Sequence, residues 1–303
     1  MHVQVLGSGA GGGLPQWNCA CDNCALARAG DARIAARTQD SIALASSAAP
    51  GVSSLLVNAS PDVLRHIERT PRLWPRAPRD TPVGAIVLTN GDLDHVVGLL
   101  SLRESQPLRI LATSRVRAGL VEHNAFLRTL ARTPDQVTWL DLTLGAELVL
   151  HDLGLGVTAL PASGKLPVHL TGVLEPSPQD NVALRVRDLA TGRVVAIATA
   201  VGGLERVPGL IAGADAVLFD GTFWSEDELV ALGLGRAHAR DMAHVPVGGP
   251  EGSLARLVLP AGTRRVYTHI NNTNPMLRTD SAERAAVERA GWEIAFDGME
   301  LAI

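Results

Sequence analysis

The stretch over residues 85–100 limits the possible folds of this chain more than any other. It opens with an apolar run over residues 85–88, which is typical of a buried strand, and returns at Val96 to an apolar run typical of a helix. Between the two runs lie Asp92, Asp94 and His95. Folds of the α/β class place their sites at the carboxyl ends of strands, before a helix. One acid there would be a helix cap, whereas two acids and a histidine favour a metal site.

The composition is that of a globular protein. Hydrophobic residues make up 46% of the 303 residues, and the formal net charge of -4 gives no electrostatic basis for a nucleic-acid or membrane partner. No apolar run reaches the roughly 18 residues of a membrane span, and residues 1–7 lack the pattern of a signal peptide. We therefore expect a cytoplasmic protein with one domain over residues 1–303, and a homodimer stays open.

A glycine-rich segment follows the first predicted strand. Gly7, Gly9 and Gly12 match the dinucleotide-binding pattern G-x-G-x-x-G, but Leu14 and Pro15 follow where that pattern needs a helix. The segment therefore favours close approach of the backbone to a site over a nucleotide-binding role.

All three cysteines of the chain lie in one short segment, at Cys19, Cys21 and Cys24. Three thiolates at this spacing can reach one ion, and clustered cysteines in a reducing compartment bind metal more often than they form disulfides. We predict a structural zinc site, which needs a fourth ligand from elsewhere in the chain. A redox pair of cysteines and unliganded thiols are the alternatives.

Three further polar residues stand at or near the ends of predicted strands. Asp220 follows the apolar run 214–219, His269 lies in the strand 265–270, and His244 lies in a loop of small residues. Asp220 alone could be a turn residue, and His244 alone could be a loop histidine with its hydrogen bonds satisfied. Convergence of strand ends from separate strands favours one shared site.

Together these motifs resemble the metallo-β-lactamase superfamily over essentially the whole chain. The glycine-rich loop, the cysteine cluster, the run from Thr89 to His95 and the run from Thr268 to Pro275 more narrowly resemble the family of coenzyme pyrroloquinoline quinone (PQQ) synthesis protein B. The resemblance implies an α/β (α+β) fold, namely an αββα four-layer sandwich of two mixed sheets flanked by helices. It also implies a metal site at one edge.

The chain departs from the superfamily signature H-x-H-x-D-H, whose positions are held by Asn90, Asp92, Asp94 and His95. No histidine occurs in residues 161–165, and residues 198–201 lack the expected bridging aspartate. Most ligands of the first ion of a two-metal hydrolase are therefore missing. The remaining set is Asp94, His95 and His269, with Asp92 as a further anionic contact.

Two histidines and one carboxylate with open positions are the ligand set of mononuclear Fe(II) oxygenases, although zinc stays open as the active-site ion. The resemblance implies that PQQ is built from a cross-linked Glu and Tyr. Our hypothesis is hydroxylation of the tyrosine-derived ring of this small-molecule precursor with O2 at one Fe(II). By analogy with related hydrolases, Asp220 and His244 would be catalytic residues that transfer protons or hold the substrate.

Other interpretations stay open at this level. The chain could be a soluble carrier of PQQ or its precursor, or it could retain a metal-dependent hydrolase activity. The fourth ligand of the cysteine-bound zinc is also open, because Asn272 and Asn274 both lie just past His269 and asparagine is a poor zinc ligand.

Overall fold

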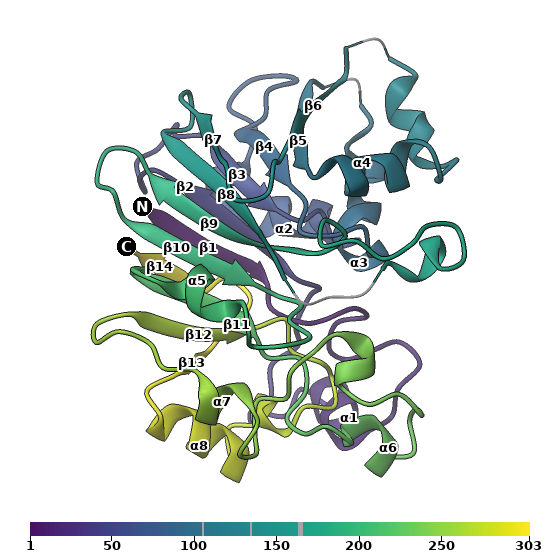
Figure 1. The fold of residues 1–303 in the computed structure, drawn as a ribbon, viewed down its shortest axis with the longest axis vertical. Coiled ribbons are helices and arrows are strands. Elements are labelled where there is room, and N and C mark those ends of the chain that lie inside the picture. The colour runs from purple at the N-terminus through teal and green to yellow at the C-terminus, as the bar shows by residue number, and fades with distance from the viewer. Residues whose placement is uncertain (105, 134, 163–165) are drawn as a thin grey trace.

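The computed structural model describes residues 1–104, 106–133, 135–162 and 166–303. In these ranges the strands form two seven-stranded sheets, and the helices lie on the outer faces of the sheets (Figure 1). The predicted αββα sandwich is confirmed.

The first sheet contains both parallel and antiparallel neighbours, so it is mixed as predicted. It joins the first and last strands of the chain. In spatial order its strands are β14 (Glu300–Ala302), β1 (His2–Gly7), β2 (Ser41–Ala45), β3 (Ser54–Val57), β4 (Val83–Val87), β5 (Leu108–Ala112) and β6 (Val137–Asp141).

The second sheet is mixed as well, with parallel pairing from β10 to β13 and antiparallel pairing from β7 to β10. In spatial order its strands are β13 (Glu293–Ile294), β12 (Arg264–Thr268), β11 (Ala216–Asp220), β10 (Val194–Ala198), β9 (Val182–Asp188), β8 (Leu155–Pro161) and β7 (Glu147–Leu150).

Short helices cover the outer faces. The α-helices are α1 (Asp22–Arg28), α2 (Val63–Arg69), α3 (Leu93–Val96), α4 (Ser114–Val121), α5 (Val207–Ile211), α6 (Glu228–Ala231), α7 (Ser253–Arg256) and α8 (Ala282–Arg289). The 3-10 helices are η1 (Pro71–Leu73), η2 (Val97–Leu102), η3 (Leu127–Ala131), η4 (Val168–Leu170), η5 (Arg240–Met242) and η6 (Pro275–Leu277).

Side chains that alternate along each strand fill three separate cores. In β2, Ile42 and Leu44 point into the core between the sheets, whereas Ala43 points into the core under the outer helices. In β3, Leu55 and Leu56 divide in the same way. Successive side chains point to opposite faces of the sheet, and both faces are covered. Both strands are therefore apolar at almost every position.

The two sheets are joined at the edge where β4 and β12 end. The backbone of Gly9, just after β1, pairs with Ile270, just after β12. Asn90, just after β4, pairs with Asn181, just before β9. The segments that follow β4 and β12 are therefore brought toward one another from opposite sheets.

The helix after β4 begins earlier than its apolar pattern predicts. We expected it from Val96, but α3 begins at Leu93 and passes into the 3-10 helix η2. Gly98 packs so closely on the turn that precedes α2 that an added Cβ would lie 2.1 Å from the carbonyl oxygen of Ser60. Asp94 and His95 are consequently in the first turn of the helix, at the joined edge of the sheets.

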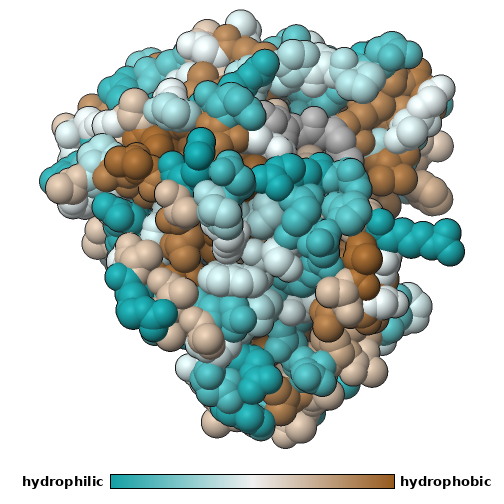
Figure 2. All heavy atoms as spheres, turned by 60° about the horizontal axis from the view of Figure 1, so that its bottom comes forward, coloured by the Kyte–Doolittle hydropathy of each residue, from teal (hydrophilic) through white to brown (hydrophobic). Residues whose placement is uncertain are grey.

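No helix in the described ranges is both long enough and apolar enough to cross a membrane. On the face shown in Figure 2, hydrophobic and hydrophilic residues are interspersed over the surface.

Candidate metal centres

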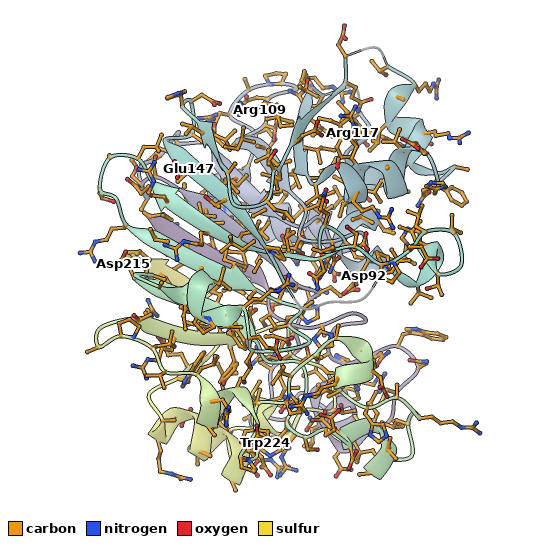
Figure 3. The ribbon with its side chains drawn as sticks, viewed as in Figure 1. Asp92, Arg109, Arg117, Glu147, Asp215 and Trp224 are labelled. Carbon is orange, nitrogen blue, oxygen red and sulfur yellow. The ribbon has the colours of Figure 1, made fainter. Side chains whose placement is uncertain are left out.

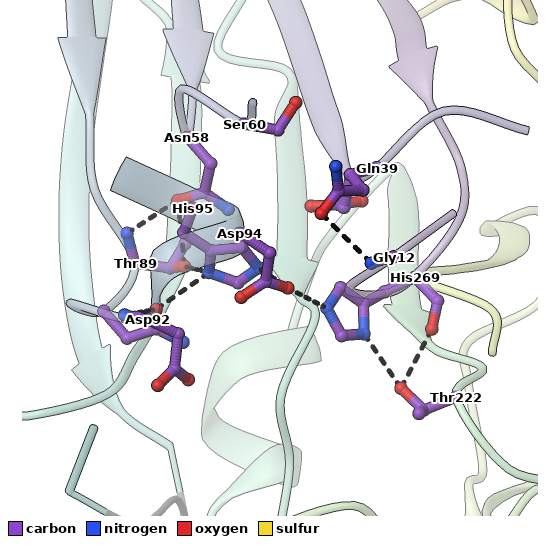
Figure 4. Close-up of polar contacts among 12 residues, drawn as sticks. Gly12, Gln39, Asn58, Ser60, Thr89, Asp92, Asp94, His95, Thr222 and His269 are labelled. Carbon is purple, nitrogen blue, oxygen red and sulfur yellow. Dashed lines mark hydrogen bonds and ion pairs between the residues drawn. The ribbon is translucent and has the colours of Figure 1, made fainter. Parts of the chain in front are cut away.

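Three of the predicted ligands meet at the joined edge of the two sheets (Figure 4). Asp94 Oδ2 lies 3.7 Å from Nε2 of His95 and 3.7 Å from Nε2 of His269. Both histidines are buried, at 1% and 4% exposure. Asp94 and His95 come from α3 after the first sheet, and His269 directly follows β12 of the second sheet.

The ring of His95 is held by side chains from the turn between β4 and α3. Its Nδ1 lies 2.8 Å from Oδ1 of Asn90 and 3.2 Å from Oγ1 of Thr89. An amide oxygen accepts only, so Nδ1 donates and the lone pair is on Nε2, which faces Asp94. Asn90 occupies a position where the superfamily signature has a metal-binding histidine, and here it orients the neighbouring ligand instead.

The ring of His269 is held by Thr222, which lies just after β11. Its Nδ1 lies 2.8 Å from Oγ1 of Thr222 (Figure 4). The Thr222 hydroxyl lies 2.7 Å from Oδ1 of Asp220. A hydroxyl that donates to Asp220 can accept from the Nδ1–H of His269, which again leaves Nε2 free to bind a metal. His269 has a φ of 55°, in the left-handed region that non-glycine residues rarely adopt.

The charges of the three groups depend on one another. Burial alone would raise the pKa of Asp94, but His95 and His269 lower it overall. Burial lowers the pKa of His95, which keeps this ring neutral. Burial acts in the same direction on His269, yet Asp94 and Asp40 outweigh it and raise the pKa of His269 to about 9. The trio therefore holds a proton that a bound metal ion would replace.

The residues present fit a divalent metal ion. Nε2 of His95 and Nε2 of His269 are both buried without a hydrogen-bond partner, and both face the same carboxylate oxygen. Buried nitrogen atoms of this kind cost free energy unless a ligand satisfies them. Two imidazoles and one carboxylate are suitable ligands for Fe(II) or Zn(II).

A small cavity of about 240 Å³ opens beside the trio. It is lined by all three ligands and by Asp92, His244 and Asn271. Gly11 of the glycine-rich segment also lines it, and an added Cβ there would lie 3.1 Å from Asp94 Oδ2. A side chain at this position would crowd Asp94, so the glycine permits the close approach that the sequence predicts.

Asp92 is the residue directly before α3 and lies beside this helix (Figure 3). It lines the cavity, but among the described residues its carboxylate does not belong to a group of three ligand atoms within 4.8 Å of one another. Its predicted role as a fourth contact therefore stays a prediction.

Asp220 and His244, the predicted catalytic pair, are hydrogen-bonded to each other across 2.8 Å. Asp220 is fully buried and also accepts from the backbone N–H of Val201 and from Thr222. Burial alone would raise the pKa of Asp220, but His244, His269 and the hydrogen bond from Thr222 lower it overall. His244 stacks on His269 with 5.5 Å between ring centroids and lines the cavity. The pair can exchange a proton with a molecule in the cavity.

The positions that would hold the ligands of a second ion in a two-metal hydrolase carry other residue types here. β10 ends at Ala198, and Ala200 lines the cavity in place of a carboxylate. Residues 163–165, part of the segment in which the sequence lacks the expected histidine, lie outside the described residues. Besides the trio, the described residues at this edge include one further group that could hold a metal ion, namely Asp220, His244 and His269, and it shares His269 with the trio.

We expect Asn90→Ala to weaken metal binding at the trio about tenfold, because His95 loses the hydrogen bond that fixes its ring. Competition with a chromophoric chelator measures this affinity. Asn181→Ala is the matched control, since Asn181 lines the same cavity but donates to the carbonyl oxygen of Ala200 rather than to a ligand. Equal affinities in the two variants would contradict the role of Asn90.

The three cysteines form a second cluster, with their sulfur atoms within 4.8 Å of one another. Cys24 lies in α1 and is fully buried, whereas Cys19 and Cys21 are partly exposed. Among the described residues no disulfide joins them. Burial raises the pKa of Cys21 to about 11, so the cluster without a cation does not carry three negative charges. A bound zinc ion would stabilise the thiolate forms.

A buried carboxyl group beside the cysteine cluster gives a test of pH dependence. Glu228 in α6 accepts hydrogen bonds from the backbone N–H of Trp224 and the hydroxyl of Thr273, and burial raises its pKa to about 7. The folded chain keeps this proton over a range of pH where the unfolded chain loses it. The free energy of unfolding therefore falls as pH rises from about 4.5 to about 7.

We expect Glu228→Gln to remove this penalty. The variant should be more stable than the unmodified chain by about 1–3 kcal/mol at pH 8, with no gain near pH 4. Urea unfolding at both pH values measures the difference. A difference that does not change with pH would contradict ionisation of Glu228 as its cause.

The sequence predicted the three candidate ligands that the fold brings together, but not the residues that orient them. Thr222 and Asn90 act through contacts that only the folded chain creates. Asp40 is a further example, because it is fully buried, accepts from Thr268 and has Oδ2 without a partner. Burial raises the pKa of Asp40 to about 6. Its position at the start of a strand carries no signal of a site.

Comparisons with known proteins identify the family and the fold of the chain. A family model described as a β-lactamase superfamily domain matches residues 54–270. Coenzyme PQQ synthesis protein B of a Methylorubrum extorquens strain is 42% identical, with 99% of each chain covered. The protein of the same name from a strain of Pseudomonas putida is 40% identical over the full length of both chains.

Solved structures give the same grouping. The crystal structure of Zn(2+)-bound PqqB from Methylobacterium extorquens superposes with a TM-score of 0.91 at 41% identity and covers all of both chains. A diphosphatase from the PhnP family superposes with a TM-score of 0.67 at 18% identity, covers 99% of this chain and 96% of its own, and shares the fold. From its sequence identity over the full length and its matching fold, the chain belongs to the coenzyme PQQ synthesis protein B family within the β-lactamase superfamily.

Proposed function

We propose that this chain acts in PQQ biosynthesis and that its chemistry occurs at a single metal ion held by Asp94, His95 and His269. Membership of the family supports the first part, because relatives about 40% identical over the whole chain are named for the synthesis of this coenzyme. The second part depends on the two buried Nε2 atoms that face one carboxylate oxygen.

The finer proposal is hydroxylation of the tyrosine-derived ring of the cross-linked Glu–Tyr precursor. In the overall reaction a ring C–H becomes C–OH with one oxygen atom of O2. The other oxygen atom leaves as water, with two electrons and two protons from an external reductant such as ascorbate. A bound Fe(II) ion would supply O2 chemistry at the open positions beside its three protein ligands.

The residues around the cavity would bind and orient the phenol. His244 is the group placed to accept the phenolic proton, because it lines the cavity and is held through Nδ1 by the anionic Asp220. A phenol that loses its proton is richer in electrons and is oxidised more readily at the ring. Asn271 and Asn181, which also line the cavity, would supply neutral hydrogen-bonding groups.

Loading the chain with Fe(II) under anaerobic conditions and then adding the precursor, O2 and ascorbate tests the proposal. We expect a product that has gained one oxygen atom by mass, labelled when 18O2 is used. Parallel samples with Zn(II) in place of Fe(II) should give no such product.

Two other results would overturn the hydroxylase. Tight binding of PQQ or its precursor without turnover, unaffected by Asp94→Ala, would identify a carrier. Turnover of a phosphodiester or a lactone with Zn(II), and none of the precursor with Fe(II), would identify a hydrolase.

A further inference from the structure

A second cavity adjoins the glycine-rich segment. It has a volume of about 440 Å³ and lies between residues 12–15, residues 36–39, α2 and Asp297. Small-molecule sites in proteins usually enclose about 300–1,000 Å³, so this cavity has room for a small ligand.

The glycine-rich segment forms one wall of this cavity. Gln39 Oε1 accepts from the backbone N–H of Gly12 across 3.1 Å, which fixes the segment (Figure 4). Gly13 has a φ of 63°, and an added Cβ there would lie 2.7 Å from the carbonyl oxygen of Arg37. Gly11 lines the cavity of the metal-binding trio, whereas Gly12 and Gly13 line this one. The two cavities are therefore neighbours that share no lining residue.

The charged side chains that line this cavity are mainly positive. Arg37, Arg65 and Arg69 carry three positive charges, and Asp62 and Asp297 carry two negative charges. The described lining residues thus leave a surplus of one positive charge.

The two aspartates are occupied by neutral donors rather than by the arginines. Asp297 accepts from the backbone N–H and the hydroxyl of Ser8, and from the same two groups of Thr38. Asp62 accepts from the backbone N–H and the side-chain amide of Gln39. These hydrogen bonds hold the walls of the cavity together and leave the arginines without a carboxylate partner.

Arg37 is the buried cation of the cavity, at 6% exposure. Its Nη1 donates to the hydroxyl of Ser8 and to the carbonyl oxygen of Ala295, but its Nε is buried without a hydrogen-bond partner. Burial lowers the pKa of Arg37 to about 10, and the charge of Asp297 offsets this only in part. A buried cation with an unpaired N–H costs free energy, which a nearby anion would reduce.

Arg65 and Arg69 line the exposed side of the same cavity. They are four residues apart on α2, so they are neighbours on one helix face and their like charges repel. Within the ranges that the structure describes, neither guanidinium has a hydrogen bond or an ion pair. Guanidinium groups match the geometry of carboxylate and phosphate oxygens, so such a pair suits an anionic group.

We propose that this cavity is a binding site for a small organic anion, whose carboxylate or phosphate group is held by Arg65 and Arg69 near the buried charge of Arg37. The anion would balance the surplus positive charge and relieve the repulsion on α2. The site is separate from the metal centre and does not depend on the reaction proposed there.

Calorimetric titration of the metal-loaded full chain with succinate and, separately, with inorganic phosphate tests the proposal. We expect saturable binding of at least one of these anions, with one anion bound per chain. Arg65→Gln and Arg69→Gln should each weaken it about tenfold or more, because each removes charge-assisted hydrogen bonds. Both residues are exposed, so the substitutions should leave the fold intact.

Arg289→Gln is the matched control, because Arg289 is also exposed and ends α8 as Arg69 ends α2. It makes the same change in net charge and should alter the affinity by less than about twofold at equal ionic strength. Amide resonances of Gly12, Gly13 and Gln39 should shift during the titration and thereby locate the anion. Binding should persist in Asp94→Asn, since the site does not use the active-site ion.

Binding of succinate alone would identify a carboxylate ligand and binding of phosphate alone a phosphate ligand, and either result supports the site. Absence of saturable binding for both anions would overturn it. An equal loss of affinity in Arg289→Gln and Arg65→Gln would also overturn it, because binding would then follow net charge alone. Binding that is lost in Asp94→Asn but kept in Arg69→Gln would place the anion on the active-site metal instead.

Discussion

Asp94→Asn is expected to abolish metal binding at the active site. The substitution keeps the size of the side chain but removes the charge that lies 3.7 Å from both unpaired imidazole nitrogens. Loss of a partner that only orients a ligand typically weakens metal binding about 10–100-fold, and Asp94 faces the ion directly. We therefore expect roughly a 100-fold loss of affinity or more, measured by metal content after gel filtration and by calorimetric titration.

Asp92→Asn is the control for this experiment. It makes the same chemical change in the same cavity, two residues earlier, at a carboxylate that is not grouped with the two histidines. We expect it to reduce affinity less than tenfold. If Asp94→Asn kept one equivalent of metal at the histidine site, the proposed centre would be wrong. The sulfur-bound metal should remain in both variants.

His244→Asn is expected to lower the rate of hydroxylation about 100-fold without loss of metal. Asparagine retains an N–H that can donate to Asp220, but it cannot accept and release a proton at the position of Nε2. General acid–base groups typically contribute factors of about 10²–10⁴ to a rate, and we take the lower end because water can reach this cavity. Single-turnover kinetics with the loaded protein measures the effect.

The pH dependence separates proton transfer from a structural role. If His244 accepts the phenolic proton, the variant should regain part of its rate at high pH, where the phenol ionises without help. Asp220→Asn should resemble it, because the histidine then loses its anionic partner. A rate that falls equally at all pH values, together with a changed metal content, would show that His244 supports the metal site instead.

Sequence reasoning succeeded where a signal is local. The residue types at the ends of β4, β11 and β12 are unusual for turns, and the fold brings Asp94, His95 and His269 together as expected. It could not separate Asp92 from Asp94, because the backbone changes from extended to helical between them and directs their side chains differently. Nor could the sequence separate Asn272 from Asn274, because only the folded chain directs the Asn272 side chain to the three sulfur atoms and the Asn274 side chain to the carbonyl oxygens of Gly221 and Thr222.

Helix lengths were the weakest part of the prediction. The apolar pattern over residues 226–234 predicts one helix, but α6 contains only Glu228–Ala231. Gly233 lies just beyond it with a φ of 68°, which ends the helix. Similar short helices around the site leave most of its polar residues in loops, whose conformation depends on contacts that are distant in sequence.

The ligands of the proposed ion come from opposite halves of the sandwich, two after β4 and one after β12. An ion bound to all three would cross-link the two sheets at the edge where β4 and β12 end. Amide protons near the ends of these two strands should then exchange more slowly in concert when metal is added, although the strands themselves belong to different sheets. A bound metal would in this way stabilise this edge of the sandwich as well as supply its chemistry. Without metal, the two sheets should separate first at this edge.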